Sequence, residues 1–230
     1  MTRTCSKWHK PVIGLTGGIG AGKSAAARIL ASLGAAVTDS DALAQEELND
    51  PKVIGALREW WGDSVLGTHG GIDRKKLADI VFRNPDDLRR LEELVYPRIA
   101  ARRDALAAGW DDDPSVTAIV IDAPKLYEAG IDELCDAVIF VDAERPVRLR
   151  RLGALRGWTE EELARREAAQ NPLDEKRAFA DYIVANNSSI DQLRLAVERV
   201  LASVLASFSK KRFRATRPSE SLKKRSSCTM

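Results

Sequence analysis

The run Gly17-Gly18-Ile19-Gly20-Ala21-Gly22-Lys23-Ser24 has the residue types and the spacing of a phosphate-binding loop, or P-loop. Its glycines let backbone N–H groups approach phosphate oxygens, because no Cβ blocks the way. Lys23 can reach the β- and γ-phosphates of a nucleoside triphosphate, and the Ser24 hydroxyl can bind Mg²⁺. An apolar run at residues 12–15 predicts a strand before the loop, and helix formers predict a helix after it. This context favours a triphosphate site over an ordinary glycine-rich turn.

Polar residues follow four further apolar runs of the chain. The runs and their polar residues are 35–37 with Asp39 and Asp41, 118–121 with Asp122, 137–141 with Asp142, and 182–184 with Asn186. Because the carboxyl ends of parallel strands meet at one edge of a sheet, we expect the carboxylates to gather beside the P-loop. Asp122 is then placed to hold Mg²⁺, although it could instead cap a following helix, as could Asp39, Asp41 and Asn186.

Strand and helix patterns alternate along the chain and predict an α/β fold, with a five-stranded parallel sheet covered by helices on both faces. Helical patterns at about 51–108 predict a helical subdomain, and an arginine-rich helical stretch at about 144–172 is typical of a lid. The P-loop domain is expected to span residues 12–208. We expect residues 1–11 to form a disordered lead and residues 209–230 a basic, disordered tail.

Two local features carry expectations of their own. Pro97 lies inside the helical pattern at 87–106 and is expected to kink or split that helix. The stretch Asp111-Asp112-Asp113-Pro114 reads as a solvated acidic loop.

The composition is that of a globular protein, with 230 residues, 44% of them hydrophobic and 30% charged. The net charge of +2 is uneven: residues 209–230 carry +7, so the other 208 residues carry −5. The sequence pI of about 8.4 therefore belongs to the tail and gives little support for nucleic-acid binding. Cys5, Cys135 and Cys228 are scattered and odd in number, which fits a reducing cytoplasm and suggests no metal site. The sequence contains no run of 18 apolar residues, so no membrane-spanning helix is expected.

Other motifs distinguish among P-loop proteins. A GTPase needs Asp-x-x-Gly after a strand and Asn-Lys-x-Asp for guanine, and neither string occurs. The glycines do not fall in the Gly-x-Gly-x-x-Gly spacing of a dinucleotide site. A motor ATPase usually carries a pair of adjacent carboxylates after its Walker B strand. Here Asp122 is followed by Ala123-Pro124-Lys125, with no adjacent carboxylate. The short chain and the arginine-rich stretch indicate a small-molecule kinase with a closing lid.

From Val12 to about Leu205 the sequence resembles the dephospho-CoA kinase family. The stretches that carry the resemblance are residues 14–24, Asp39-Ser40-Asp41 with residues 42–44, residues 72–82 and on to Tyr96-Pro97, and Gln170 to Lys176 with Ala180-Asp181 and Asn186. The resemblance implies ATP-dependent phosphorylation of the ribose 3′-hydroxyl of dephospho-CoA, the last step of CoA synthesis. The alternatives are another P-loop kinase acting on a nucleoside or nucleotide, and a non-catalytic nucleotide sensor or nucleic-acid partner that uses the basic tail.

The resemblance also implies roles for particular residues. Asp41 is expected to contact the 3′-hydroxyl as general base or orienter, and Asp39 to support it. Arg151 and Arg156 are expected to close over the triphosphate, since a planar guanidinium suits phosphate oxygens. Asn186 could contact adenine. The expected site residues are catalytic Asp41, Lys23 and Arg151; nucleotide-binding Gly18, Gly20, Ala21, Gly22, Lys23, Ser24, Ala25, Arg156 and Asn186; substrate-binding Asp39, Asp41, Arg74 and Tyr96; and metal-binding Ser24 and Asp122.

ATP and Mg²⁺ are the expected cofactors and dephospho-CoA the expected small-molecule partner, for a cytoplasmic monomer or weak homo-oligomer without membrane partners. The chain departs from the family near the substrate. The family commonly has His at Tyr96, Leu-Leu-Phe-Glu at residues 125–128, and an arginine at Leu155, where this chain has Arg156 one residue later. Ala25 also stands where many P-loops carry a second hydroxyl. These departures bear on substrate contacts more than on ATP binding.

Overall fold

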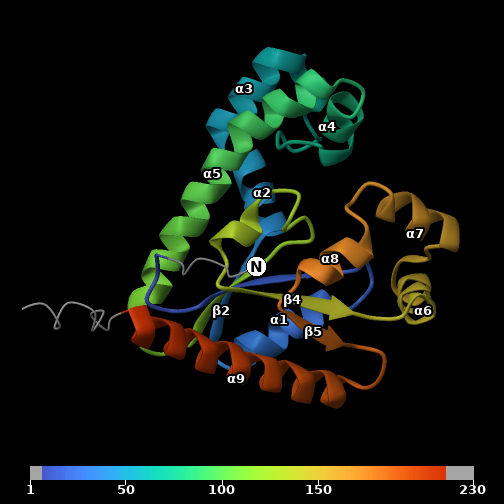
Figure 1. Ribbon diagram of the computed structural model, residues 1–230. Coiled ribbons are helices and arrows are strands. Elements are labelled where there is room, and N and C mark those ends of the chain that lie inside the picture. The colour runs from blue at the N-terminus through green and yellow to red at the C-terminus, as the bar shows by residue number, and fades with distance from the viewer. Residues whose placement is uncertain (1–6, 216–230) are drawn as a thin grey trace, which may run out of the picture.

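The computed structural model describes residues 7–215 (Figure 1). At its centre lies a parallel sheet of five strands in the order β2-β3-β1-β4-β5, which confirms the predicted fold class. The strands are β1 (Val12–Gly17), β2 (Ala35–Asp39), β3 (Ala118–Asp122), β4 (Ala137–Asp142) and β5 (Tyr182–Ala185). Every residue of β1 and β3 is buried, because helices cover both faces of the sheet.

Helices and short 3₁₀ turns connect the strands (Figure 1). They are α1 (Lys23–Ser32), α2 (Ser40–Leu48), α3 (Pro51–Trp61), η1 (Gly62–Val65), α4 (Arg74–Val81), α5 (Pro85–Asp112), η2 (Ile131–Leu134), α6 (Arg145–Arg156), α7 (Glu160–Glu167), α8 (Leu173–Phe179) and α9 (Ile190–Ala215). Within residues 7–215, no helix combines the length and the apolar character needed to cross a membrane.

Different helices pack on the two faces of the sheet. On one face, Leu30 of α1 and Leu193 of α9 pack against alternate strand residues such as Leu15. On the other face, Ala107 of α5 packs with residues of the loop after β3, such as Leu126. Alternate residues of each strand point to opposite faces, so the continuous apolar runs serve both cores.

The helical subdomain has an apolar core of its own, formed by α3, η1, α4 and the amino-terminal half of α5. Val53, Leu57 and Leu77 are buried in it, and Trp60 and Trp61 pack at its margin. The long helix α5 joins the two parts of the molecule, since its carboxyl-terminal half lies on the sheet (Figure 1). The subdomain is therefore anchored to the sheet domain by a continuous helix.

Pro97 neither ends nor splits α5, so of the two expected outcomes, a kink or a split, the split is not observed. Proline removes one backbone donor, while neighbouring contacts hold the helix in place. Arg98, the residue after the proline, supplies two of these contacts. It donates to Glu47 at 2.8 Å and contacts Asp50 at 3.0 Å. Tertiary ion pairs thus favour one continuous helix across the proline.

Parts of both segments that were predicted to be disordered, residues 7–11 and 209–215, are described by the structure. Helix α9 continues to Ala215, so residues 209–215 of the predicted disordered tail are helical. Phe208 is buried and Arg212 donates to the carbonyl oxygen of Trp8 at 2.9 Å, which ties α9 to the amino-terminal segment. Of the predicted lead, residues 7–11 make contacts with the folded domain. The rest of both predicted segments, residues 1–6 and 216–230, lies outside the described residues.

The acidic stretch at residues 111–113 is not a loop, because α5 extends to Asp112, although Asp112 and Asp113 are exposed as expected. Asp111 lies inside α5 and accepts hydrogen bonds from the backbone N–H groups of His9 and Lys10, at 3.0 and 2.9 Å. Burial opposes ionisation of Asp111, but these bonds and the His9 side chain lower its pKa below the ordinary value. The acidic helix end therefore fixes the amino-terminal segment.

Candidate active site

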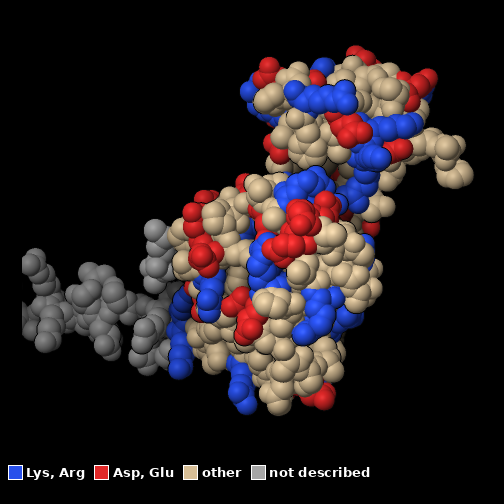
Figure 2. Space-filling model, turned by 90° about the vertical axis from the view of Figure 1, so that its right-hand side faces the viewer, with Lys and Arg blue, Asp and Glu red and all other residues tan. Residues whose placement is uncertain are grey.

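The P-loop lies where β1 meets α1, at the edge formed by the carboxyl ends of the strands. Strand register places Asp39 of β2 and Leu15 of β1 beside Asp122 of β3. Asp142 of β4 lies beside Ala185 of β5 at the same edge. The predicted gathering of the loop and the carboxylates is therefore observed. Figure 2 looks onto this edge, where basic and acidic side chains gather between the helical subdomain and the sheet domain.

Glycine is required at the turn from the loop into α1. Gly22 has φ 94° and ψ 25°, a left-handed conformation that costs a residue with a Cβ about 1–2 kcal/mol. A Cβ at this position would also collide with the side-chain amide of Asn186. Helix α1 has no side-chain cap, so its first N–H groups remain available to an anion, which the positive end of the helix dipole favours.

Side chains from distant elements hold the loop in shape. The buried Asn186 donates to the carbonyl oxygen of Ala21 at 2.7 Å and contacts Arg151 at 3.3 Å. Arg151 itself lies 3.4 Å from the same carbonyl. The amide group of Asn186, a predicted contact for adenine, bonds to the P-loop in the structure. The strand-end asparagine is thus a support for phosphate-binding residues.

Arg148 was not singled out by sequence reasoning, yet it is the most buried arginine at the site, with 4% of its surface exposed. Its guanidinium donates to the carbonyl oxygens of Ile19 and Ala143, both at 3.1 Å, and pairs with Glu167 of α7. Burial opposes ionisation of Glu167, but hydrogen bonds from Arg148 and Arg145 lower its pKa. Arg148 therefore joins the loop to both helices of the predicted lid, α6 and α7.

Lys23 and Asp122 form an ion pair at the centre of the site. Asp122 is only 4% exposed, and burial raises its pKa, with Lys23 opposing the rise and the carboxylates of Asp39 and Asp41 adding to it. Strand register and this ion pair bring Asp39, Asp122 and Lys23 together, and Asp41 lies in the first turn of the helix that follows Asp39. Asp122 therefore holds the Lys23 ammonium group beside the P-loop, within reach of a bound triphosphate.

The two carboxylates after β2 have different surroundings. One oxygen of Asp39 caps α2, accepting from the backbone N–H groups of Asp41 and Ala42 at 2.9 and 3.1 Å. The helix therefore begins at Ser40, and neither Ser40 nor Asp41 is its cap. The exposed carboxylate of Asp41 accepts no hydrogen bond from any residue between 7 and 215. Asp41 is thus the carboxylate that remains free to meet a ligand.

The remaining predicted substrate residues lie on the helices beyond β2. Arg74 begins α4 and lies 3.5 Å from Gln45 of α2, which is one helical turn beyond Asp41 on the same face. Tyr96 is half exposed, and its hydroxyl donates to Glu92 of its own helix at 2.8 Å. Burial, together with this hydrogen bond, raises the pKa of Tyr96 to about 12. Arg74 is therefore linked to the site, whereas the bond of Tyr96 stays within α5.

Arg156, the second predicted lid arginine, has a different environment from Arg151. It is exposed at the end of α6, and its guanidinium lies 5.1 Å from the centre of the Trp158 ring. Arg166 of α7 packs on the same ring at 4.3 Å. Arg156 thus contributes to packing between α6 and α7, while Arg151 and Arg148 touch the P-loop.

A buried lysine in α8 completes the site and was not assigned a role from the sequence. Lys176 is 1% exposed and donates to the carbonyl oxygen of Pro124 at 3.0 Å, to Gln170 at 3.1 Å and to Glu128 at 2.7 Å. Burial opposes ionisation of Glu128, but hydrogen bonds from Lys176 and the Asn171 backbone lower its pKa. This network fastens the loop after Asp122 to the segment that follows the predicted lid.

The residues present fit a magnesium ion. Ser24 in the first turn of α1 and Asp122 at the end of β3 offer a hydroxyl and a carboxylate, the hard oxygen ligands that Mg²⁺ prefers. Mg²⁺ commonly keeps several waters and binds through one or two carboxylates and the phosphates of its nucleotide. A set of only two protein ligands is therefore compatible with Mg²⁺.

The sheet order, the P-loop and the arginine-bearing helices that contact it define the chain as a P-loop NTPase of the small-molecule kinase type. Residues 11–192 match the family described as "Dephospho-CoA kinase". The chain belongs to the dephospho-CoA kinase family.

Individual relatives agree with this assignment. A dephospho-CoA kinase of Streptomyces avermitilis is 37% identical over 210 residues, which cover 91% of this chain and 98% of that protein. One of Thermobifida fusca is 39% identical over 190 residues, or 82% of this chain and 93% of that protein. A crystal structure of TT1252 from Thermus thermophilus superposes with a TM-score of 0.73 at 34% identity, covering 85% of this chain and 98% of that one.

Proposed function

We infer that this chain transfers the terminal phosphoryl group of ATP to the ribose 3′-hydroxyl of dephospho-CoA, giving CoA and ADP. The family match over residues 11–192 supports this substrate. The observation that carries the chemistry is the cluster of Lys23, Asp122, Asp39 and Asp41 at the P-loop edge, because it places a phosphate-binding cation beside carboxylates that can bind a metal and an alcohol. A carboxylate can accept the proton of an alcohol, and the cation neutralises charge on the transferred phosphoryl group.

We propose that Lys23 leaves Asp122 when ATP binds and contacts the β- and γ-phosphates instead. Backbone N–H groups of the P-loop and the start of α1 hold the same phosphates. Arg151 reaches the phosphates from α6, while Arg148 and Asn186 keep the loop carbonyls in place. Since little covalent work falls to the protein in phosphoryl transfer, this positioning and charge neutralisation supply most of the rate.

Ser24 and Asp122 would hold Mg²⁺, directly or through water, once Lys23 has turned away. A bound Mg²⁺ neutralises charge on the β- and γ-phosphates. The residues of this chain then act on the acceptor. The free carboxylate of Asp41 orients the 3′-hydroxyl and accepts its proton as the oxygen attacks, and Asp39 holds the start of α2, and so Asp41, in position.

We propose that the remaining parts of dephospho-CoA lie against α2, α4 and α5. Arg74 supports a phosphate contact, because its exposed guanidinium contacts Gln45, which lies one helical turn beyond Asp41 on α2. Tyr96 occupies the family's histidine position and offers a hydroxyl from a half-exposed site. The enzyme is proposed to act as a monomer or weak homo-oligomer in a reducing cytoplasm. The few, scattered cysteines of the sequence support this compartment.

The test is turnover with Mg-ATP and dephospho-CoA, compared with a panel of nucleosides and nucleotides. CoA and ADP formed in equal amounts, with no comparable turnover of the panel, are the expected result. Efficient phosphorylation of a nucleotide without CoA formation would reject the proposal in favour of a nucleotide kinase. Removal of Mg²⁺ with EDTA should abolish turnover, and unchanged turnover would reject the metal site.

A further inference from the structure

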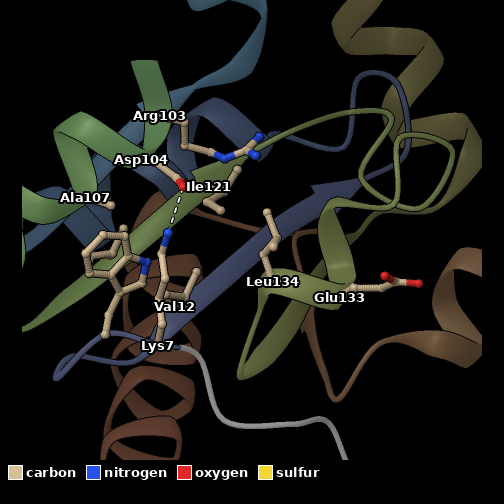
Figure 3. Close-up of a pocket in the computed structure, with 10 residues that line it drawn as sticks. Lys7, Val12, Arg103, Asp104, Ala107, Ile121, Glu133 and Leu134 are labelled. Atoms are coloured by element: carbon tan, nitrogen blue, oxygen red, sulfur yellow. Dashed lines mark hydrogen bonds and ion pairs between the residues drawn. The ribbon is translucent and has the colours of Figure 1, made fainter. Parts of the chain in front are cut away.

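A cavity lies on the sheet face opposite α1 and α9, under the carboxyl-terminal half of α5 (Figure 3). Its volume is about 250 Å³. Val12 and Ile119 of its floor belong to the beginnings of β1 and β3, whereas the P-loop follows the far end of β1. The cavity is therefore separate from the phosphate-binding edge.

Most of the cavity wall is apolar. The residues that supply this wall are Trp8, Val12, Ala107, Ile119, Ile121 and Leu134. Leu134 of η2 remains 45% exposed, which leaves a large apolar side chain at the mouth of the cavity. A ligand that covers this side chain and the floor gains about 25 cal/mol for each Å² of apolar surface removed from water.

One charged group in this wall lacks a partner. Arg103 is 8% exposed, yet its guanidinium makes no hydrogen bond or ion pair with any residue in the range 7–215. Figure 3 shows it extending from α5 along one side of the cavity, past Ile121. Burial lowers the pKa of Arg103, and the nearby Asp104 and Cys135 only partly compensate. A buried charge without a partner is costly, so the site favours an anion.

The acidic residues of the cavity do not meet this need. Asp104 pairs with Lys7 at 2.8 Å on the other side of the cavity. The exposed Glu133 extends away from Arg103 (Figure 3). With Lys7 and Asp104 balanced against each other, the interior presents one positive charge. A dianion would introduce one negative charge too many, next to two carboxylates.

We propose that this cavity binds a small organic carboxylate, with the carboxylate on Arg103 and an apolar chain against Trp8, Val12 and Leu134. A planar guanidinium matches a carboxylate through two parallel hydrogen bonds. The apolar wall favours a ligand that also has a hydrocarbon chain. The cavity is smaller than the roughly 300–1,000 Å³ usual for drug-sized ligands, so the ligand is small.

Calorimetric titration of the full chain, with the P-loop filled by ADP, tests the site using hexanoate, hexan-1-ol and inorganic phosphate as probes. Hexanoate should bind saturably at one site, and hexan-1-ol at least about tenfold more weakly because it lacks the charge. Arg103→Met should weaken hexanoate by at least about tenfold. Arg102→Met is the matched control, because the neighbouring Arg102 faces Glu46 of α2 instead, and it should bind hexanoate as the wild type does.

Thermal unfolding supplies an independent readout. Arg103→Met removes an unpaired buried charge, so its Tm without ligand should equal or exceed that of the wild type, while hexanoate should raise the Tm of the wild type only. Should Arg103→Met fail to fold, Leu134→Glu places a carboxylate at the exposed mouth and should weaken hexanoate binding. Absence of saturable hexanoate binding, equal binding by Arg103→Met or Leu134→Glu, or tighter binding of phosphate than of hexanoate would overturn the proposal.

Discussion

The phosphate-binding end and the acceptor end of the active site are built differently. At the phosphate end, Arg148, Asn186 and Lys23 are each held by partners from other elements. At the acceptor end, Asp41 is exposed without a hydrogen-bond donor among the described residues, and Tyr96 bonds only within α5. The difference indicates that the loop is preorganised for triphosphate, whereas the acceptor itself orders the side chains that meet it. Preorganised charge is the main source of catalysis in phosphoryl transfer.

The largest effect is expected from the acceptor end. Asp41→Asn keeps the shape of the side chain but removes its ability to accept a proton, so kcat should fall by about 10²–10⁴ while ATP affinity is unchanged. Asp39→Asn is the matched control, because asparagine also caps helices, and it should retain more activity. Steady-state kinetics with dephospho-CoA check both. Unchanged turnover of Asp41→Asn would assign the base to another group.

The next effect tests the phosphate end. Lys23→Ala should lower kcat/KM by about 10²–10³, since one charge on the transferring phosphates is lost. The fold should remain, because burial already raises the pKa of Asp122, so this carboxyl group can become neutral once its cation is removed. Lys52→Ala, at an exposed position in α3, should be silent. Equal activity of Lys23→Ala and Lys52→Ala would contradict the proposed nucleotide site.

The third prediction concerns the Lys176–Glu128 pair and the stability of the fold. Glu128→Gln should lower the free energy of unfolding by about 1–3 kcal/mol, because the buried Lys176 loses its charged partner. The folded-state pKa of Glu128 is below its ordinary value of 4.5, so its stabilisation is present above that pH and lost as the pH falls through the folded pKa.

Chemical denaturation between pH 3 and pH 7 measures this effect. Wild-type stability should fall toward acid more steeply than that of Glu128→Gln. Parallel pH profiles would show that Glu128 is not a stabilising carboxylate.

Asn186 links the loop to the last strand. Asn186→Ala leaves the carbonyl oxygen of Ala21 and the guanidinium of Arg151 without this partner, and we expect KM for ATP to rise about tenfold. The neighbouring Asn187 accepts instead from the backbone of Glu144 at an exposed position, so Asn187→Ala should leave KM for ATP within about twofold. Equal effects of the two changes would mean that Asn186 acts through the strand end rather than through the loop.

The smallest effect is expected at Tyr96. Tyr96→Phe removes a hydroxyl whose hydrogen bond stays within α5, so stability should change by about 0.5 kcal/mol or less. Any catalytic effect should appear as a rise in KM for dephospho-CoA with KM for ATP unchanged. A larger loss in kcat than in KM would place Tyr96 among the reacting groups.

Much of the site was predictable because its residues lie in short stretches with their own conformational signals. The P-loop, its strand and its helix follow from glycine placement and apolar periodicity within a few residues. The carboxylates followed from their positions at strand ends. Asp39 shows the limit, because capping and ligand binding use the same residue type after a strand. Only the geometry of α2 assigned one oxygen to the cap.

The sequence by itself determined the class of the fold, the phosphate-binding loop and the residues at the carboxyl edge of the sheet, since each depends on neighbours in the chain. The tertiary structure alone decided the roles of Arg148 and Lys176 and the support of the loop by Asn186. These contacts join residues separated by 129, 52 and 165 positions. An arginine or a lysine in a charged helix is usually solvated, and it becomes a buried partner only when the packing of distant elements brings acceptors to it.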